Sequence, residues 1–118
     1  MSEQASANVQ ASRFGAWLDH HGFSIVASLG RMLRNLKALY AEKEDWERAL
    51  RCTDRILTLE PEAPAELRDR GLLYLRVGHY KAAREDLSKF LATKPPEKDA
   101  ESVREVLIKT SAERARLN

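Results

Sequence analysis

Apolar residues return every three or four positions along most of this chain, which is the spacing that places side chains on one face of an α-helix. In the longest such segment the face consists of Leu29, Leu33, Leu36 and Tyr40. No segment shows the convincing alternation of a half-buried strand. The pattern therefore predicts an all-α protein, with helices over residues 8–20, 24–43, 46–59, 64–77, 80–92 and 99–113.

Residues with strong local preferences mark the helix ends. Asp45 suits the N-cap before Trp46, because its carboxylate can accept hydrogen bonds from unpaired backbone N–H groups. Pro64 suits the first turn of a helix, Gly78 suits a helix end, and the prolines within residues 94–96 stop the helix before them. We therefore expect short helices joined by tight turns.

The chain repeats itself with a period of 34 residues. Four features return at that distance: Tyr40 as Tyr74, Trp46 as Tyr80, Ala49 as Ala83 and Pro61 as Pro95. A fixed period of this length indicates a unit of two antiparallel helices that stacks on its neighbours.

The unit resembles the tetratricopeptide repeat, in which small residues let two helices approach and aromatic residues fill the space between neighbours. The second unit carries Leu67, Gly71, Tyr74, Gly78, Tyr80, Ala83, Phe90 and Pro95 at the expected places. The first carries Leu33, Leu36, Tyr40, Trp46, Ala49 and Pro61. The first unit departs from the family pattern at Lys37, where a small residue is usual, and at Thr53, where an aromatic is usual.

Residues 30–108 also resemble the C-terminal repeat region of bacterial SirB-type proteins, through the stretches RMLRNLKALY, DWERALR and LRDRGLLYLRVG. Those proteins join a transglutaminase-like domain to a tetratricopeptide tail, and the resemblance implies regulatory or scaffolding work. Residues 1–30 are too few to form a transglutaminase-like domain, so no enzymatic role carries over from the family.

The repeats suggest four parts: a disordered tail, an N-terminal helical cap or docking segment, two repeats, and a C-terminal capping helix. These parts are residues 1–7, 8–29, 30–96 (30–63 and 64–96) and 97–118. Two repeats are fewer than the three usually needed for a continuous core, so the flanking helices are expected to act as caps. Phe14, Trp17 and Phe23 either cover the first repeat or form a docking patch for another chain.

Composition narrows the class of protein. The 118 residues are 43% apolar and 32% charged, which fits one soluble domain with a modest core. A net charge of +2 without a dense basic stripe disfavours nucleic acid as a partner. No apolar run is long enough to cross a bilayer, and the first residues do not form a secretory signal, so we expect a cytoplasmic protein with no membrane contact.

Catalytic, metal and cofactor sites are not expected. Cys52 is the only cysteine, which excludes an internal disulfide and a cysteine-based zinc site. Nothing in the pattern brings a histidine to Cys52 as a nucleophilic site would require. His20 and His21 are adjacent, so on a helix they point apart and do not form a metal site alone. The five glycines form no phosphate-binding loop.

The resemblance implies a binding site on the concave face, which the first helix of each repeat lines. Candidate peptide-binding residues there are Arg31, Arg34, Asn35, Arg68, Leu72, Leu75 and Arg76. The arginines could grip acidic groups by bidentate hydrogen bonds, or they could instead pair locally with Asp and Glu neighbours. Ala38 stands where related co-chaperones carry an asparagine that clamps a chain-terminal carboxylate, so that clamp is incomplete.

The function expected from these features is that of a protein–protein interaction adaptor, which holds a peptide or helix with acidic groups on its concave face. One alternative is a structural subunit docked through Phe14, Trp17 and Phe23. Another is a regulatory module for a separate transglutaminase-like protein. A homodimer, in which two copies pair to hide the short array, also stays open.

Overall fold

The computed structural model describes residue 13 and residues 25–117. The expected helix over residues 8–20 and the candidate patch of Phe14, Trp17 and Phe23 therefore lie outside the described residues, apart from the helical Arg13. The chain divides into two compact units, residues 1–32 and 33–118. In the first unit residues 25–32 are helical, with Gly30 buried and an exposed apolar set formed by Ile25, Leu29 and Met32.

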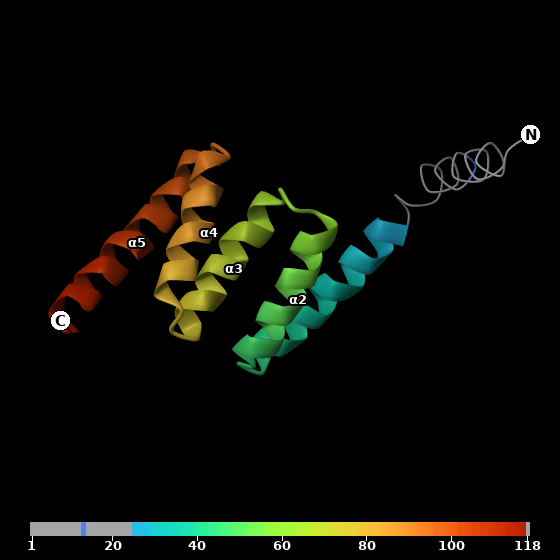
Figure 1. Cartoon of the computed structure of the whole chain (residues 1–118), viewed down its shortest axis with the longest axis horizontal. Helices are drawn as coiled ribbons and strands as arrows, with labels where there is room; N and C mark the ends of the chain where they lie inside the picture. Colours follow the sequence, from blue (N-terminus) through green and yellow to red (C-terminus); the bar gives the residue numbers. More distant parts are fainter. Residues whose placement is uncertain (1–12, 14–24, 118) are drawn as a thin grey trace, which may run out of the picture. The chain divides into compact units, whose positions relative to one another are not determined.

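The second unit consists of helices joined by short connections. The helix over residues 25–42 ends in this unit. After it come α2 (Trp46–Leu59), α3 (Pro64–Arg76), α4 (Tyr80–Ala92) and α5 (Glu97–Leu117). Figure 1 shows α2 to α5 lying side by side in chain order, and each packs against its successor. All regular structure within the described residues is helical, which confirms the predicted all-α class.

The helices begin and end where local residues favour it. Asp45 is the N-cap of α2, and its side chain accepts a hydrogen bond from the Arg48 backbone N–H at 3.2 Å. Pro64 opens α3, and Gly78 adopts a φ of 83° in the turn that follows this helix. These three predicted helix ends are confirmed.

The last helix is longer than the sequence pattern predicts. It begins at Glu97 rather than near Asp99, and it extends to Leu117 rather than ending near Glu113. The Pro96 carbonyl accepts hydrogen bonds from the backbone N–H groups of Asp99 and Ala100, both at 3.0 Å. Acidic residues in the first turn and arginines in the last turn complement the helix dipole, so charge also favours the longer helix.

The hydrophobic core lies where α2, α3, α4 and α5 meet. It consists of Leu57, Leu67, Leu87, Phe90 and Val103, with Ala63, Leu75, Leu91, Val106 and Leu107 packed against it. The helix α4 thus contributes Leu87 and Phe90 to the core, and α5 contributes Val103. This core holds α3 between its neighbours, and α3 carries half of the residues that line the site described next.

We call residues 33–42 with α2 the first helix pair, and α3 with α4 the second. Gly71 in the second pair allows close contact, because a Cβ there would lie 2.6 Å from Leu87 Cγ. The residue 34 positions earlier is Lys37, which is half-buried. Thr53 stands 34 positions before Leu87, and its hydroxyl donates to the Ala49 carbonyl at 2.9 Å within the buried interior. The two departures from the family pattern thus change the chemistry inside the first pair.

Candidate functional site

A hollow of ≈ 210 Å³ lies between residues 33–42 and α3, and we call it the groove. Its lining residues are Lys37, Ala38, Ala41, Trp46, Asp69, Leu72, Leu73 and Arg76. The residues from α3 are three or four positions apart, so they share one helix face. Most of the surface comes from small or apolar side chains, and the charged groups lie among them.

One end of the groove is tied together by ion pairs. Lys37 Nζ lies 2.7 Å from Glu66 Oε2 and 2.8 Å from Asp69 Oδ2. Arg34 Nε donates to Glu66 Oε1 at 3.0 Å, and Arg34 Nη2 donates to Glu60. Only 5% of the Glu66 side chain is exposed, and a carboxylate in such a place is costly unless it is paired. This ion-pair network links the first helix pair to α3.

The ion pairs keep both cations charged. The hydrogen bond to Glu60 raises the pKa of Arg34 above its ordinary value, with only partial opposition from burial. Burial would lower the pKa of Lys37, but hydrogen bonds to Asp69 and Glu66 outweigh it, and the pKa is raised. Arg34 and Lys37 are therefore already engaged by carboxylates of this chain.

Arg76 is in a different situation at the other end of the groove. Its guanidinium carbon lies 5.0 Å from the centre of the Trp46 ring, within the range of a cation–π contact. Among the described residues, no carboxylate lies within ion-pair distance of Arg76. Glu42, exposed on the neighbouring helix, makes no such pair with it. Arg76 thus presents a guanidinium edge that no acid of the described chain occupies.

The structure places the predicted site residues in several surroundings. Leu72 and Arg76 line the groove. Arg34 belongs to the ion-pair network, and Asn35 is exposed beside it in sequence. Two further candidates contact other residues of the chain and do not line the groove. Arg68 pairs with Asp69 at 3.3 Å and lies over the Phe90 ring, and Leu75 packs against the core. Arg31 is exposed in the unit of residues 1–32.

Six lining residues were not among the candidate peptide-binding residues predicted from the sequence: Lys37, Ala38, Ala41, Trp46, Asp69 and Leu73. Trp46 was attributed to packing between repeats, yet it is only half-buried and shares the groove with Arg76. The departure of Lys37 from the family pattern was the available signal, since a lysine at a contact position must find a carboxylate nearby.

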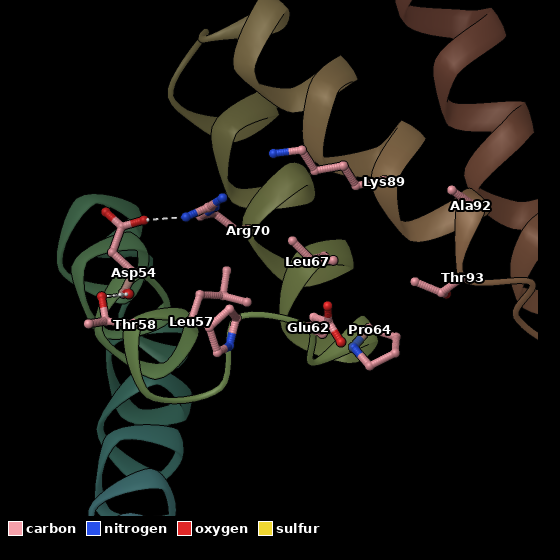
Figure 2. Close-up of a pocket in the computed structure, with 11 residues that line it drawn as sticks. Asp54, Leu57, Thr58, Glu62, Pro64, Leu67, Arg70, Lys89, Ala92 and Thr93 are labelled. Carbon is pink, nitrogen blue, oxygen red and sulfur yellow. Dashed lines mark hydrogen bonds and ion pairs between the residues drawn. The ribbon is translucent and has the colours of Figure 1, made fainter.

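A second and larger hollow of ≈ 690 Å³ lies on the other side of α3, between α2 and α4 (Figure 2). Arg70 projects into it, and its Nη1 lies 3.1 Å from Asp54 Oδ1. The same guanidinium donates to both oxygens of Asp86 at 2.6 and 2.8 Å, and this raises the pKa of Arg70. Because Arg70 is already paired with two aspartates and the remaining charges are of both signs, this hollow offers no preference for one ligand class.

Neither metal nor membrane chemistry is indicated within the described part of the chain. No group of three or more metal-ligating side chains gathers among residues 25–117. None of the described helices has the length and apolar character needed to span a bilayer. Cys52 is buried, and burial raises the pKa of its thiol, which disfavours the reactive thiolate.

Comparisons with known proteins agree with the helix-pair architecture. A family model described as tetratricopeptide repeat matches residues 36–108. The chain is 49% identical over 86 residues to the UPF0162 protein of Xylella fastidiosa (strain 9a5c), a match covering 73% of this chain and 31% of the relative. No solved structure matches the chain.

Two enterobacterial relatives are similar over a shorter stretch. The chain is 38% identical over 74 residues to the UPF0162 protein YchA of Escherichia coli (strain K12), covering 63% of this chain and 28% of the relative. It is 36% identical over 74 residues to the protein SirB1 of Salmonella typhimurium, with the same coverage of 63% and 28%. The chain therefore spans less than a third of the length of the curated relatives it matches.

Proposed function

The chain belongs to the tetratricopeptide repeat family, as its sequence predicted, and we propose that it is a non-enzymatic adaptor that holds a segment of a partner protein in the groove. Repeats of this kind generally mediate contacts between proteins. The observation that carries the proposal is the groove itself, which combines an apolar surface with a half-buried tryptophan and an arginine. Tryptophan and arginine are enriched among the residues that dominate binding at protein interfaces.

The ion-pair network supports the same proposal. It joins the helix before α2 to α3, so the two walls of the groove are held in place before any partner arrives. A binding surface that is already ordered loses little conformational entropy on association. The ion pairs are thus assigned to supporting the groove, and ligand contact is assigned to the apolar residues and Arg76.

Site-specific photo-crosslinking in cells tests this proposal. A benzophenone amino acid would replace Leu72 in the groove or, as a matched control, Lys89, an exposed residue beside the opposite hollow. We expect a discrete crosslinked partner from position 72 and much less from position 89. Ala38→Trp, which adds bulk to the groove wall, should remove the crosslink from position 72.

Two results would contradict the proposal. One is an equal or greater yield of the same partner from position 89. The other is a crosslink from position 72 that survives Ala38→Trp while circular dichroism shows an unchanged helical content. Either result would place the contact outside the groove.

A second function is favoured by a different observation. Leu36 and Leu39 are 41% and 52% exposed on one side of their helix, and neighbouring exposed apolar side chains can mark an interaction site. The alternatives expected from the sequence were a structural subunit docked through Phe14, Trp17 and Phe23, which lie outside the described residues, and a regulatory module for a separate transglutaminase-like protein. For this candidate we propose as occupant a domain like that forming the unmatched remainder of the longer relatives.

Co-purification with such a separately expressed domain tests this second function. Leu39→Glu should weaken the complex strongly, whereas Arg76→Gln in the groove should leave it unchanged. Unaltered co-purification of Leu39→Glu would refute docking through this face.

A further inference from the structure

The chemistry of the groove also specifies what kind of segment would fit, an inference that rests on the proposed function and narrows it. The volume of ≈ 210 Å³ is below the ~300–1,000 Å³ of typical small-molecule sites. A hollow of this size takes one large side chain rather than a metabolite. Its walls at Ala38, Ala41 and Leu72 are small or apolar, so an aliphatic or aromatic side chain fits them.

Charge decides what should lie beside that side chain. Lys37 is held by two carboxylates, and Asp69 is shared between Lys37 and Arg68. Arg76 alone among the cations lining the groove has no carboxylate within ion-pair distance in the described chain. The Trp46 ring contacts the guanidinium through a cation–π geometry, which leaves the N–H donors at the guanidinium edge available to an acceptor.

We propose that the groove recognises an internal peptide segment that carries one large apolar residue and a nearby aspartate or glutamate. The apolar side chain enters between Ala38, Ala41 and Leu72. The carboxylate of the acidic residue accepts hydrogen bonds from Arg76. Charge complementarity selects an acidic over a basic neighbour, because Arg76 would repel a lysine placed at the same point.

An internal acidic side chain fits better than the carboxylate at a chain terminus. Capture of a terminal carboxylate usually relies on several donors that converge on it. The wall opposite Arg76 consists of Ala38 and Ala41, whose side chains have no donor, and Lys37 is already engaged. The single guanidinium edge matches one carboxylate of an Asp or Glu side chain.

Trp46 supplies a direct reporter for the test. The chain has two tryptophans, so Trp17→Phe leaves Trp46 as the only one. The probes are short acetylated and amidated peptides with one leucine or phenylalanine and one glutamate at varied spacing. Matched peptides carry glutamine or lysine in place of glutamate. We expect a glutamate peptide to change Trp46 emission on titration and to bind about tenfold or more tightly than its glutamine counterpart.

Variants of Arg76 sharpen the test. Arg76→Gln should weaken binding of the glutamate peptide about tenfold and leave the glutamine peptide unchanged, since only the former uses the charge. Arg76→Glu should shift the preference toward the lysine peptide. Lys89→Gln, on the far side of α3, is the matched control and should change neither affinity.

The possible outcomes separate this inference from the proposed function. Equal binding of glutamate, glutamine and lysine peptides in the groove would overturn the acidic preference and leave the adaptor function standing. Tighter binding of a peptide with a free C-terminus and no glutamate would overturn the internal source of the carboxylate. No Trp46 response from any peptide overturns the inference. If the photo-crosslink from position 72 also fails, the adaptor function is refuted as well.

Discussion

The two helix pairs share one period, but different interactions join the two helices of each pair. In the second pair Arg70 and Asp86 form an ion pair between α3 and α4, and the Asp86 side chain is only 4% exposed. The residues 34 positions earlier are Leu36 and Cys52, which cannot form one. The period therefore conserves the positions of helices while leaving the interactions between them free to differ.

The neighbouring positions differ in the same way. Gly71 lets α3 and α4 approach closely, whereas the equivalent Lys37 turns away to bind carboxylates of α3. Arg70 of the second pair binds Asp86 within the pair and also reaches Asp54 of α2, whereas Lys37 of the first pair binds only carboxylates of α3. This difference has a structural consequence, because the ion pairs of Lys37 and Arg34 join the two walls of the groove.

The largest expected effect is at the ion pair of the second helix pair. Arg70→Ala leaves the buried Asp86 without its partner and should lower the free energy of unfolding by about 3–5 kcal/mol. The double variant Arg70→Leu/Asp86→Cys copies the first pair and should regain most of that loss, since no buried charge remains. Urea unfolding followed by circular dichroism measures both. A double variant as unstable as Arg70→Ala would show that the ion pair itself, rather than an orphaned charge, stabilises the pair.

The next effect concerns the close contact at Gly71. Gly71→Ala puts a methyl group 2.6 Å from Leu87 Cγ. The Leu87 side chain is fully buried, so it cannot move aside freely. We expect a loss of about 1–3 kcal/mol in unfolding free energy, despite the better helix propensity of alanine. Gly78→Ala adds the same methyl group in open space, where only the positive φ opposes it, and should cost less. Equal losses at both positions would argue against a packing contact at Gly71.

A smaller effect is expected from Lys37 and depends on pH. Lys37→Met should cost about 1–2 kcal/mol at neutral pH, because Glu66 keeps only Arg34 as a partner. The pKa of Lys37 is raised in the folded state, so its stabilisation is complete below the unfolded value of about 10.4 and is lost as the pH rises through the folded value.

Urea midpoints measured from about pH 8 to about pH 11 check this direction. Lys37→Arg is the control, because arginine keeps its charge throughout this pH range. Other groups that titrate at alkaline pH, such as Tyr74 and Cys52, are present in both proteins. The wild-type chain should lose more stability than Lys37→Arg across the alkaline range. Parallel curves would mean that the ion pairs of Lys37 contribute no net stability.

The smallest effects are expected at the helix caps, where the backbone is nearly the same in both pairs. Asp45 and His79 stand 34 residues apart as N-caps of α2 and α4, with φ, ψ of −87°, 75° and −92°, 74°. Asp45 accepts a backbone hydrogen bond, and His79 makes no side-chain cap bond. Asp45→Ala should therefore destabilise by about 1 kcal/mol, and His79→Asp should stabilise by about 0.5–1 kcal/mol. Thermal unfolding would reveal both shifts, and a destabilised His79→Asp would mean that the His79 ring contributes more than a cap would.

The helices, their ends and the repeat could be predicted from the sequence because each depends on residues close together in the chain. Helix periodicity, the Asp45 cap, the proline breaks and the glycine turn act within a few positions. The last helix was predicted too short, since its final turns depend on weak charge effects rather than on an apolar stripe. Two of the candidate site residues, Leu72 and Arg76, line the groove because their helix face followed from the repeat register.

Only the tertiary structure decided which charged groups pair and which remain available. Arg34 lies 26 and 32 positions from the two glutamates it binds, and Arg70 lies 16 positions from each of its aspartates. In the sequence Arg34, Arg68 and Arg76 are similar arginines on one predicted face. Helix packing brings two glutamates to Arg34 and the Trp46 ring to Arg76, whereas Arg68 pairs with Asp69, its neighbour in the chain. The sequence thus determined where an arginine could stand, and the approach of distant helices determined which one has no acidic partner in the described chain.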